Sequence, residues 1–340
     1  MGSSTDPTPF LTTLAYRHRP EIVARAHFID PTPRGNRSPL AALGVLLRVL
    51  RAARHEKALL LDSTSGPWYP DVLAAVVIGF WPRRKRPAVV LMGDMWEPSR
   101  SAWRLVEGVL IRLADRGITL YALQSSEEVA NFPRLWGVDP AKARLSLYFY
   151  TLSEEEVSGA PEPTGDYVFA GGNAHRDYAP LIEAARRMPE TRFMFATSRI
   201  SPKQRAGLPP NVRAEAVPHD EFVRLMRGAA AVVVPIRRGL QRAAGQQTYL
   251  NAMMLYKPTI IPDGYGVRDH VIDGENALVV DGTPEGYHRA LSWVLDPANR
   301  DQVERLKLAA REAAAQFSFS HHTARLMELV DEALRLTGRS

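Results

Sequence analysis

The segment AAVVVPIRRGLQRAAGQQTYLNAMMLYKPTIIPD, residues 230–263, decides the fold because strand-like and helix-like runs alternate within it. Residues 230–236 and 257–263 are short apolar runs, typical of strands buried in a parallel sheet. Between them, Gly245 and small polar residues precede the apolar periodic run 247–256, a pattern that predicts a helix N-terminus. A basic loop and the start of a helix are therefore expected at the same place.

Short apolar runs and helix-like segments alternate along the rest of the chain in the same way. This alternation is typical of a parallel sheet covered by helices on both faces. Pro133 is expected to break the last helix of the first half. In that half we expect strands at residues 57–62, 87–94, 118–124 and 144–150, and helices at residues 70–81, 101–117 and 125–137.

An acidic segment rich in proline and glycine, SEEEVSGAPEPTG at residues 153–165, separates two rounds of this pattern. A chain of 340 residues is also long for one core. We therefore expect an α/β fold with two Rossmann-like doubly wound domains facing a cleft. Their predicted bounds are 1–152 and 165–316, followed by a C-terminal helix over 317–340 that crosses back to the first domain.

Composition limits the class of protein. No apolar run approaches the roughly 20 residues that span a bilayer, and the N-terminus lacks the pattern of a signal peptide. Cysteine is absent, so disulfides and thiolate metal sites are excluded, as in many cytoplasmic proteins. We expect a cytoplasmic location, with peripheral attachment to the inner face of the membrane as an option.

Positive charge is concentrated in the first half of the chain. Residues 1–150 hold 20 Lys and Arg against 13 Asp and Glu, a formal charge of +7, which leaves −1 for the remainder. An anionic partner such as a membrane or a nucleic acid is one interpretation, and a solubilising arginine-rich surface is the other. No nucleic-acid recognition motif is found, so no nucleic-acid partner is expected.

Three loops of the second half combine glycines with arginines, at residues 169–178, 236–248 and 261–269. Ligands of doubly wound sheets bind at the carboxyl ends of the strands, where such loops begin. Glycines permit close backbone approach, and a helix N-terminus and basic side chains favour phosphate. Neither the dinucleotide fingerprint nor the Walker loop is present. The loops together predict a diphosphate-binding site.

Four segments carry a family resemblance: YVFAGGNAHRDYAPLIEAA (167–185), PPNVRAEAVPHDEF (209–222), AGQQTYLNAMMLYKPTII (244–261) and GVRDHVIDGENALVVDGTPEGYHRALSWVLDP (266–297). They resemble the nucleotide-sugar-binding domain of retaining GT-B glycosyltransferases of family 4. The resemblance implies transfer of a sugar from a nucleotide diphosphate sugar, such as a UDP-sugar, to an acceptor held by the first domain. The acceptor class is open: a sugar, a lipid-linked intermediate or a small molecule.

The resemblance implies roles for individual residues. Backbone N–H groups at Gly245 to Gln247 would bind the diphosphate beside Thr248. Arg176 stands where the family has a phosphate-binding lysine, and Arg199 or Lys203 would replace the family's partner arginine. The implied donor-binding residues are Gly171, Gly172, Asn173, Arg176, Arg199, Lys203, Val217, Gly245, Gln246, Gln247, Thr248 and Asn251.

Two positions depart from the family pattern. The family places two glutamates eight residues apart, and this chain has Ala243 and Asn251 there. Asn251 can still bond a ribose hydroxyl, whereas Ala243 offers no polar group to a sugar. Gln241 or Gln246 would have to compensate. A non-catalytic sugar-nucleotide-binding protein is therefore one alternative, and a GT-B nucleotide-sugar epimerase is another.

In the first half, Asp94 follows an apolar strand, and Glu97 comes three residues later. The resemblance places Asp94 near the transferred sugar, so Asp94 and Glu97 are the candidate catalytic carboxylates. A turn or capping role for Asp94 is equally open. The family chemistry needs no metal or cofactor, and none is expected from the histidine and carboxylate spacing.

The segment VLAAVVIGFWPRRKRP at residues 72–87 joins an apolar helix to four consecutive basic residues. Trp81 with Arg83, Arg84, Lys85 and Arg86 suits the surface of an anionic membrane. A core helix that ends in a solvated basic turn would have the same sequence, so both interpretations remain open.

Overall fold

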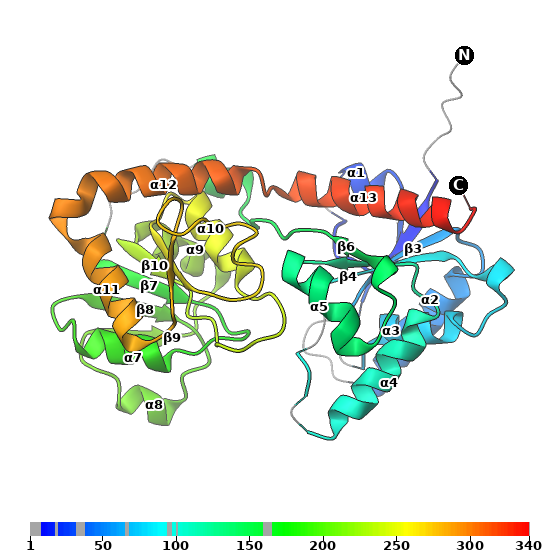
Figure 1. Cartoon of the computed structure of the whole chain (residues 1–340), viewed down its shortest axis with the longest axis horizontal. Helices are drawn as coiled ribbons and strands as arrows, with labels where there is room; N and C mark the ends of the chain where they lie inside the picture. The colour runs from blue at the N-terminus through cyan, green and yellow to red at the C-terminus, as the bar shows by residue number, and fades with distance from the viewer. Residues whose placement is uncertain are drawn as a thin grey trace, which may run out of the picture. The chain divides into compact units, whose positions relative to one another are not determined.

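The computed structural model describes residues 8–17, 20–31, 38–64, 68–93, 97–99, 101–158 and 165–339. The chain divides into two compact units (Figure 1). Unit 1 is Met1–Leu147 with His322–Ser340, and unit 2 is Tyr148–His321. Each unit contains one six-stranded parallel sheet with interleaved helices, so the prediction of two Rossmann-like domains is confirmed.

The sheet of unit 1 has the strand order β2-β1-β3-β4-β5-β6, and neighbouring strands are parallel. Its strands are short and almost wholly apolar, as expected where helices cover both faces. The strands are β1 (Phe10–Thr12), β2 (Ala26–Phe28), β3 (Ala58–Asp62), β4 (Ala88–Met92), β5 (Leu120–Leu123) and β6 (Ala143–Leu145).

Two groups of helices cover the faces of this sheet. On one face the apolar sides of α2 (Pro39–Ala52), α3 (Pro70–Ile78), α4 (Trp103–Asp115) and α5 (Ser126–Trp136) form one buried cluster with the strands. On the other face α1 (Pro20–Val23) packs with α13 (Phe319–Leu336), which contributes the buried residues Leu326, Leu329 and Val330. The last helix of the chain is therefore part of the core of unit 1 from His322 onward.

Helix α5 corrects one sequence expectation. The helix does not break at Pro133 but continues to Trp136. Ser125 caps its start by accepting a hydrogen bond from the Glu128 N–H, and Gly137 in the left-handed conformation ends it. Burial of Phe132 and Trp136, which are 3% and 2% exposed, offsets the backbone hydrogen bond that proline removes.

The sheet of unit 2 has the strand order β12-β11-β10-β7-β8-β9, again all parallel, and Figure 1 labels β10, β7, β8 and β9 within it. The chain moves outward from β7 in one direction and then resumes at β10 on the other side, so the topological switch lies between β7 and β10. The strands are β7 (Tyr167–Gly171), β8 (Arg192–Ala196), β9 (Val212–Glu215), β10 (Ala231–Val233), β11 (Thr259–Pro262) and β12 (Leu278–Val280).

Helices of unit 2 also lie on both faces of their sheet. The apolar side of α7 (Ala179–Arg186) packs with α11 (Pro284–Leu295) on one face. On the other face α9 (His219–Gly228), α10 (Gln246–Met254) and α12 (Arg300–Ala315) share one core cluster with the strands. The segment 230–263 thus folds as the predicted strand, basic loop, helix and strand.

The short helices are α6 (Glu154–Ser158) and α8 (Pro202–Ala206), with 3₁₀ turns η1 (Arg83–Lys85), η2 (Pro140–Lys142) and η3 (Pro297–Asn299). Within the described ranges, no helix has the length and apolar character that crossing a membrane requires.

Candidate functional site

Two loops meet at the topological switch of unit 2. They follow β7 and β10, which are neighbours in the sheet, so their carboxyl ends lie side by side. The Asp177 N–H donates to the Pro235 carbonyl at 2.9 Å, and the Arg237 N–H donates to the His175 carbonyl at 2.8 Å. This short antiparallel pairing joins the two arginine-bearing loops at the position where ligands of doubly wound sheets bind.

Arg176 connects the end of β7 to the first turn of α10. Its Nε donates to the Gly171 carbonyl at 3.2 Å, its Nη1 to the Ala174 carbonyl at 2.9 Å, and its Nη2 to Thr248 Oγ1 at 3.0 Å. Burial lowers the pKa of this guanidinium, which nevertheless stays charged, as arginine does in proteins. Three hydrogen bonds therefore hold one positive charge beside the helix N-terminus.

Gly245 is the N-cap of α10 and requires glycine for two reasons. Its φ is +79°, in the left-handed region, and a Cβ there would lie 2.8 Å from Ile236 Cδ1. The first N–H groups of a helix lack partners within the helix and carry the positive end of its dipole. The α10 N-terminus, whose first turn includes Thr248, is therefore suited to an anion. The diphosphate contact expected at Gly245, Gln246 and Gln247 stays a prediction.

Four arginines surround the imidazole of His175. The pKa of His175 is lowered to about 4, first by burial and then by the charges of Arg242, Arg237, Arg176 and Arg199. The imidazole is thus neutral at pH 7, and the net local charge comes from the guanidinium groups. The sequence comparison with the family did not single out His175, although it lies between two predicted residues in the loop NAHR.

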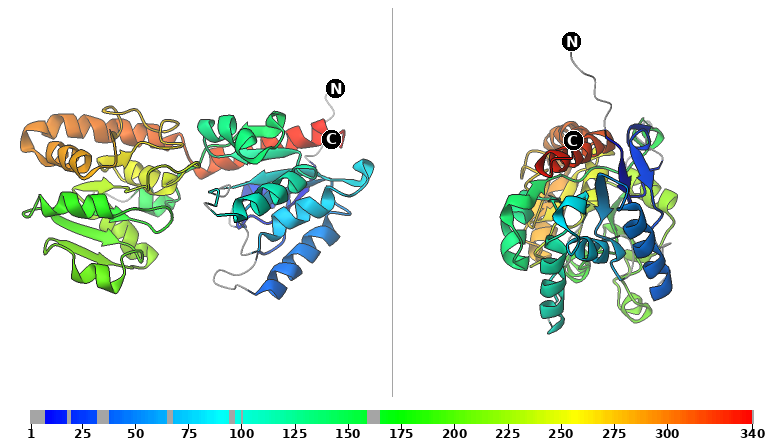
Figure 2. Two further views of the ribbon diagram at one scale, coloured as in Figure 1. Left: turned by 60° about the horizontal axis from the view of Figure 1, so that its bottom comes forward. Right: turned by 90° about the vertical axis from the view of Figure 1, so that its right-hand side faces the viewer.

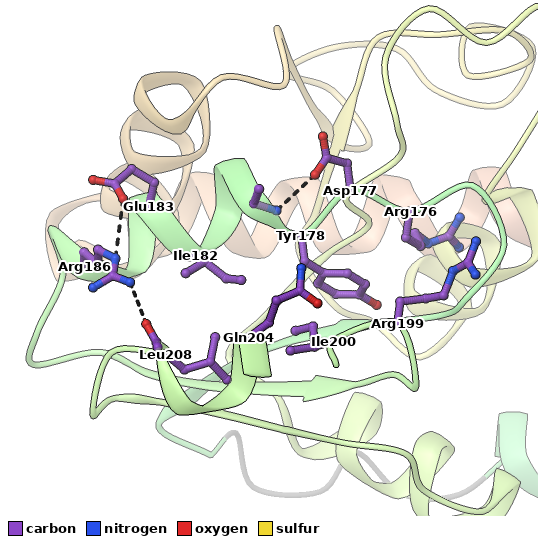
Figure 3. A pocket seen from close by; sticks show the side chains of 12 residues that line it. Arg176, Asp177, Tyr178, Ile182, Glu183, Arg186, Arg199, Ile200, Gln204 and Leu208 are labelled. Atoms are coloured by element: carbon purple, nitrogen blue, oxygen red, sulfur yellow. Dashed lines mark hydrogen bonds and ion pairs between the residues drawn. The ribbon is translucent and has the colours of Figure 1, made fainter. Parts of the chain in front are cut away.

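Arg199 reaches this cluster from the loop after β8. With Arg176 it lines a hollow of about 330 Å³, whose other walls come from α7 and α8 (Figure 3). The structure therefore brings Arg199 together with Arg176, and a phosphate contact by Arg199 stays a prediction. Lys203 lies exposed in α8, and Val217 packs beside the core between β9 and α9.

Hydrogen bonds from Tyr178 and from the loop after β8 hold the turn that begins at Gly171 and Gly172. Gly172 has a φ of +107°, and its carbonyl accepts from Tyr178 Oη at 2.7 Å. Asn173 Oδ1 accepts from the Ser198 N–H at 2.9 Å and lies 2.9 Å from Thr197 Oγ1. The Asn173 carboxamide oxygen therefore ties the β7 loop to the β8 loop, and a donor contact by Asn173 stays a prediction.

The two positions that depart from the family pattern are both buried. Ala243 is 1% exposed and belongs to the core. Asn251 is 4% exposed, and its Oδ1 accepts from the Thr151 N–H at 2.8 Å while its Nδ2 donates to Thr151 Oγ1 at 3.1 Å. Gln247 Nε2 donates to the same hydroxyl at 2.9 Å. Helix α10 thus holds the segment around Thr151, and the ribose contact of Asn251 stays a prediction.

Asp94 lies outside the described residues, so its predicted role is untested by the structure. Glu97 is half-buried, and the nearby Ser99 is held by Glu107 of α4, which accepts from the Ser99 N–H at 3.0 Å and from its hydroxyl at 2.6 Å. Immediately before Asp94, Gly93 has a φ of +116°, and a Cβ there would lie 2.9 Å from Ser63 Oγ.

Polar side chains that the sequence did not identify gather at the carboxyl ends of β1 and β3. The Asp62 N–H donates to Thr13 Oγ1 at 3.0 Å, and Thr13 Oγ1 donates to Asp71 Oδ2 at 2.9 Å. Asp71 is fully buried at the start of α3. We call Thr13, Asp62, Ser63 and Asp71 the polar edge of unit 1. All four come before Asp94 and Glu97 in the sequence. Within the described ranges, no group of three or more histidines and carboxylates could hold a metal ion.

Comparisons with solved structures assign the fold. An Anabaena protein, HepE, in complex with UDP is 14% identical, covers 96% of this chain and 99% of its own, and has a TM-score of 0.67. A glycosyltransferase from Rickettsia africae is 11% identical over 96% of this chain and 90% of its own, with a TM-score of 0.63. Sucrose-phosphate synthase from Thermosynechococcus elongatus is 14% identical over 92% and 84%, with a TM-score of 0.65.

The chain has the two-domain architecture of GT-B glycosyltransferases, as the sequence resemblance predicts. No protein-family model matches the sequence, and no curated protein matches it either. At these identities the likeness concerns the fold, and function depends on the residues at the site.

Proposed function

We propose that the protein is a glycosyltransferase that moves a sugar from a nucleoside diphosphate sugar to an acceptor. The observation that carries this proposal is the convergence of four arginines and the N-terminus of α10 at the topological switch of unit 2. A diphosphate is the group that such a site would neutralise. HepE, whose fold is similar, has been solved with UDP and with UDP-glucose, which favours a uridine nucleotide.

The same cations would promote the reaction as well as bind the donor. When the bond between the sugar and the diphosphate breaks, negative charge grows on the departing phosphate oxygens. Groups that are already oriented stabilise this charge without reorganisation. Arg176 is oriented by three hydrogen bonds before any ligand binds. We propose that this route proceeds without a metal ion and without a cofactor.

The finer assignments rest on the sequence resemblance. We propose retention of anomeric configuration, membership of family 4, a hexosyl donor and an acceptor bound by unit 1. Asp94 and Glu97 would act on the transferred sugar. The polar edge that contains Thr13, Asp62 and Ser63 lies at the carboxyl ends of β1 and β3, where ligands of doubly wound sheets bind, which favours an acceptor site in this part of unit 1.

A second function, binding of a sugar nucleotide without catalysis, is favoured by one observation. The two residues at the family's glutamate positions, Ala243 and Asn251, have no carboxylate. In addition, Ala243 is buried, and the Asn251 carboxamide is bonded to Thr151. A site with these features can still hold a diphosphate through Arg176 and α10. Turnover separates the two functions, because binding is common to both.

The experiment measures release of UDP from a panel of UDP-sugars, with and without added acceptors, by the wild-type chain and by Asp94→Asn. A glycosyltransferase releases UDP faster with the correct acceptor. We expect Asp94→Asn to lower this rate by roughly 100-fold or more and to leave the melting temperature and the UDP dissociation constant unchanged. If Asp94→Asn turned over at the wild-type rate, Asp94 would be a turn residue, and Glu97 would be the remaining candidate for the catalytic carboxylate. Binding of UDP without turnover of any donor would favour the non-catalytic function.

A further inference from the structure

Exposed apolar side chains are distributed unequally between the two units. Of the large apolar side chains that are exposed in the described part of the chain, thirteen belong to unit 1 and two, Ile272 and Leu308, belong to unit 2. Nine of the thirteen lie on one layer of helices, α2, α3 and α4, or directly after α3. These three helices lie side by side in that order (Figures 1 and 2).

Helix α2 shows the arrangement most clearly. Its inner side buries Ala42, Val45 and Val49 against the sheet. Its outer side carries Leu40, Leu43 and Leu47, which are 77%, 47% and 57% exposed and recur at helical spacing. The core therefore accounts for one apolar stripe of α2, and a second apolar stripe is left at the surface.

Helices α4 and α3 extend this exposed apolar surface. On α4, Leu105 is 72% exposed and Val109 is 54% exposed, whereas Ile111 and Ala114 are buried on the opposite side. Just after α3, Phe80 is 64% exposed. We call the outer surface of the three helices the α2–α4 face. Its exposed apolar members are Leu40, Leu43, Leu47, Val77, Phe80, Trp103, Leu105, Val106 and Val109.

Positive charge borders this apolar surface. The outer stripe of α2 continues from Leu47 to Arg51 and Arg54, and residues 39–55 contain three arginines and no acidic residue. Exposed Arg83, Arg84 and Lys85 form η1, shortly after Phe80. The two basic groups meet in a hollow of about 680 Å³. Five of its lining residues are cationic: Arg54, Lys57, Arg84, Lys85 and Arg339.

The one acidic residue that lines this hollow, Glu56, is already engaged. Its carboxylate lies 2.7 Å from His27 Nδ1. A hollow with five cationic side chains and one paired carboxylate is suited to a phosphate group. The combination of exposed large apolar side chains and a hollow lined by cationic side chains is suited to an anionic phospholipid surface.

The structure also changes which residues of the 72–87 segment face solvent. Trp81 is half-buried and packs against the core cluster of unit 1. Arg86 is tied to the backbone, with its Nε donating to the Trp81 carbonyl at 2.8 Å and its Nη1 to the Arg116 carbonyl at 2.9 Å. The exposed contacts are therefore Phe80 and the residues of η1, together with α2 and α4.

We propose that the α2–α4 face binds an anionic lipid bilayer, with its apolar side chains inserted at the interface and its arginines and lysines at the lipid phosphates. Nucleic acid is a poorer partner for this face, because it exposes nine large apolar side chains. An acidic protein could also meet the bordering cations, and the test below separates it from lipid. The proposal concerns unit 1 alone and does not depend on the glycosyltransferase assignment.

The test is co-sedimentation of the full chain with vesicles of phosphatidylcholine alone or with about 40% phosphatidylglycerol. We expect at least about tenfold stronger partitioning to the anionic vesicles. The variant Leu43→Gln/Leu47→Gln/Leu105→Gln/Val109→Gln should lose at least about tenfold of this binding. All four side chains are exposed, so the melting temperature should not fall. The matched control is Ile272→Gln/Leu308→Gln, which alters the exposed apolar residues of unit 2 and should bind vesicles like wild type.

A second pair of variants tests the charges. Arg51→Ser/Arg54→Ser/Lys85→Ser should weaken binding to anionic vesicles by roughly tenfold or more, and Arg192→Ser/Arg213→Ser/Arg224→Ser in unit 2 should not. Absence of binding to anionic vesicles by the wild type would overturn the proposal, as would equal binding by the wild type and the glutamine variant. A dimer that the glutamine variant alone fails to form would assign the face to a second copy of the chain instead.

Discussion

Units 1 and 2 have the same scaffold of six parallel strands between helices, but they place charge differently. Unit 2 concentrates guanidinium groups inside the site, around His175 at the carboxyl edge of its sheet. Unit 1 has hydroxyls and carboxylates at the corresponding edge and distributes its arginines over the outer surface of α2 and around η1. The half of the sequence with a net charge of −1 therefore contains the cluster of four arginines around His175.

This difference shows that net charge does not locate an anion site. The excess of +7 in residues 1–150 lies where solvent, or in our proposal a lipid surface, screens it. In unit 2, backbone carbonyls hold Arg176 and Arg242, and both act on His175 together with Arg237 and Arg199. Position at the switch between β7 and β10 is thus more informative than the total charge of either half.

The largest effect is expected from Gly245, which shapes the anion site of unit 2. Gly245→Ala forces a Cβ to within 2.8 Å of Ile236 Cδ1 at a φ of +79°. We expect a loss of about 2–4 kcal/mol in the free energy of unfolding from overpacking and left-handed strain together, and loss of UDP binding at micromolar concentrations. Denaturant unfolding and calorimetry measure both.

Gly239→Ala is the matched control for Gly245. Gly239 lies in the same loop with a φ of +72°, but no atom lies within 4 Å of its Cβ position. Only the strain of about 1–2 kcal/mol should remain. If the two variants were equally stable and bound UDP equally well, the α10 N-terminus would not be the phosphate site.

The next effect distinguishes two histidines, one in each unit. His322 in unit 1 is 3% exposed, and burial lowers its pKa to about 4, whereas arginine charges contribute to the same shift in His175. Between about pH 6.5 and pH 4, each of these two imidazoles is protonated in the unfolded chain and neutral in the folded protein. Stability is therefore fully present above pH 6.5 and falls as the pH decreases toward 4.

NMR titration of the histidines turns this into a test of the site. Bound UDP should raise the pKa of His175, because phosphate charge offsets the field of the four arginines. The pKa of His322 should not move, since burial and the Leu147 carbonyl at 3.0 Å determine it. An unchanged His175 pKa with saturating UDP would place the nucleotide elsewhere.

A smaller effect is expected at Asn251, which holds Thr151. Asn251→Leu leaves the Thr151 N–H without its partner and leaves Thr151 Oγ1 with Gln247 alone, so the free energy of unfolding should fall by about 1–3 kcal/mol. We expect the same variant to weaken UDP binding through the lost ribose contact. Asn251→Glu should fold and bind UDP, because carboxylate oxygens can accept from both Thr151 groups. A Leu variant with lower stability and wild-type UDP affinity would limit Asn251 to its structural role.

Sequence patterns were sufficient for elements with strong local signals. Residues 230–263 carry two apolar runs and a glycine N-cap, and α5 has a serine N-cap and a glycine C-cap, so their existence could be predicted. Strands β1 and β2 were not predicted, because three residues each, FLT and AHF, give no periodic signal. Strand β1 is placed by pairing with β3, where Leu11 lies beside Leu59, 48 residues later in the chain, and β2 is placed by pairing with β1.

The site was predictable only where one loop carries the signal. Arg176 and Gly245 could be assigned because their loops match a family pattern. The charges of Arg237 and Arg242 that act on His175, and the bonding of Asn251 to Thr151, involve residues 62 to 100 positions apart. Such contacts follow from the tertiary fold, and the sequence around either partner alone does not reveal them. The burial of Trp81 follows from the same cause.

The most direct measurement of the donor site is calorimetric titration of UDP into the wild type, Arg176→Ala and Arg192→Ala. Both arginines belong to unit 2, but Arg192 begins β8 at the opposite end of the sheet and pairs with Asp166. Loss of a charged hydrogen-bond donor to phosphate costs roughly 1.5–3 kcal/mol. We predict that Arg176→Ala weakens UDP binding at least about tenfold and that Arg192→Ala leaves it unchanged, with both proteins folded by circular dichroism. Equal affinities in the three proteins would contradict the assignment of the donor site.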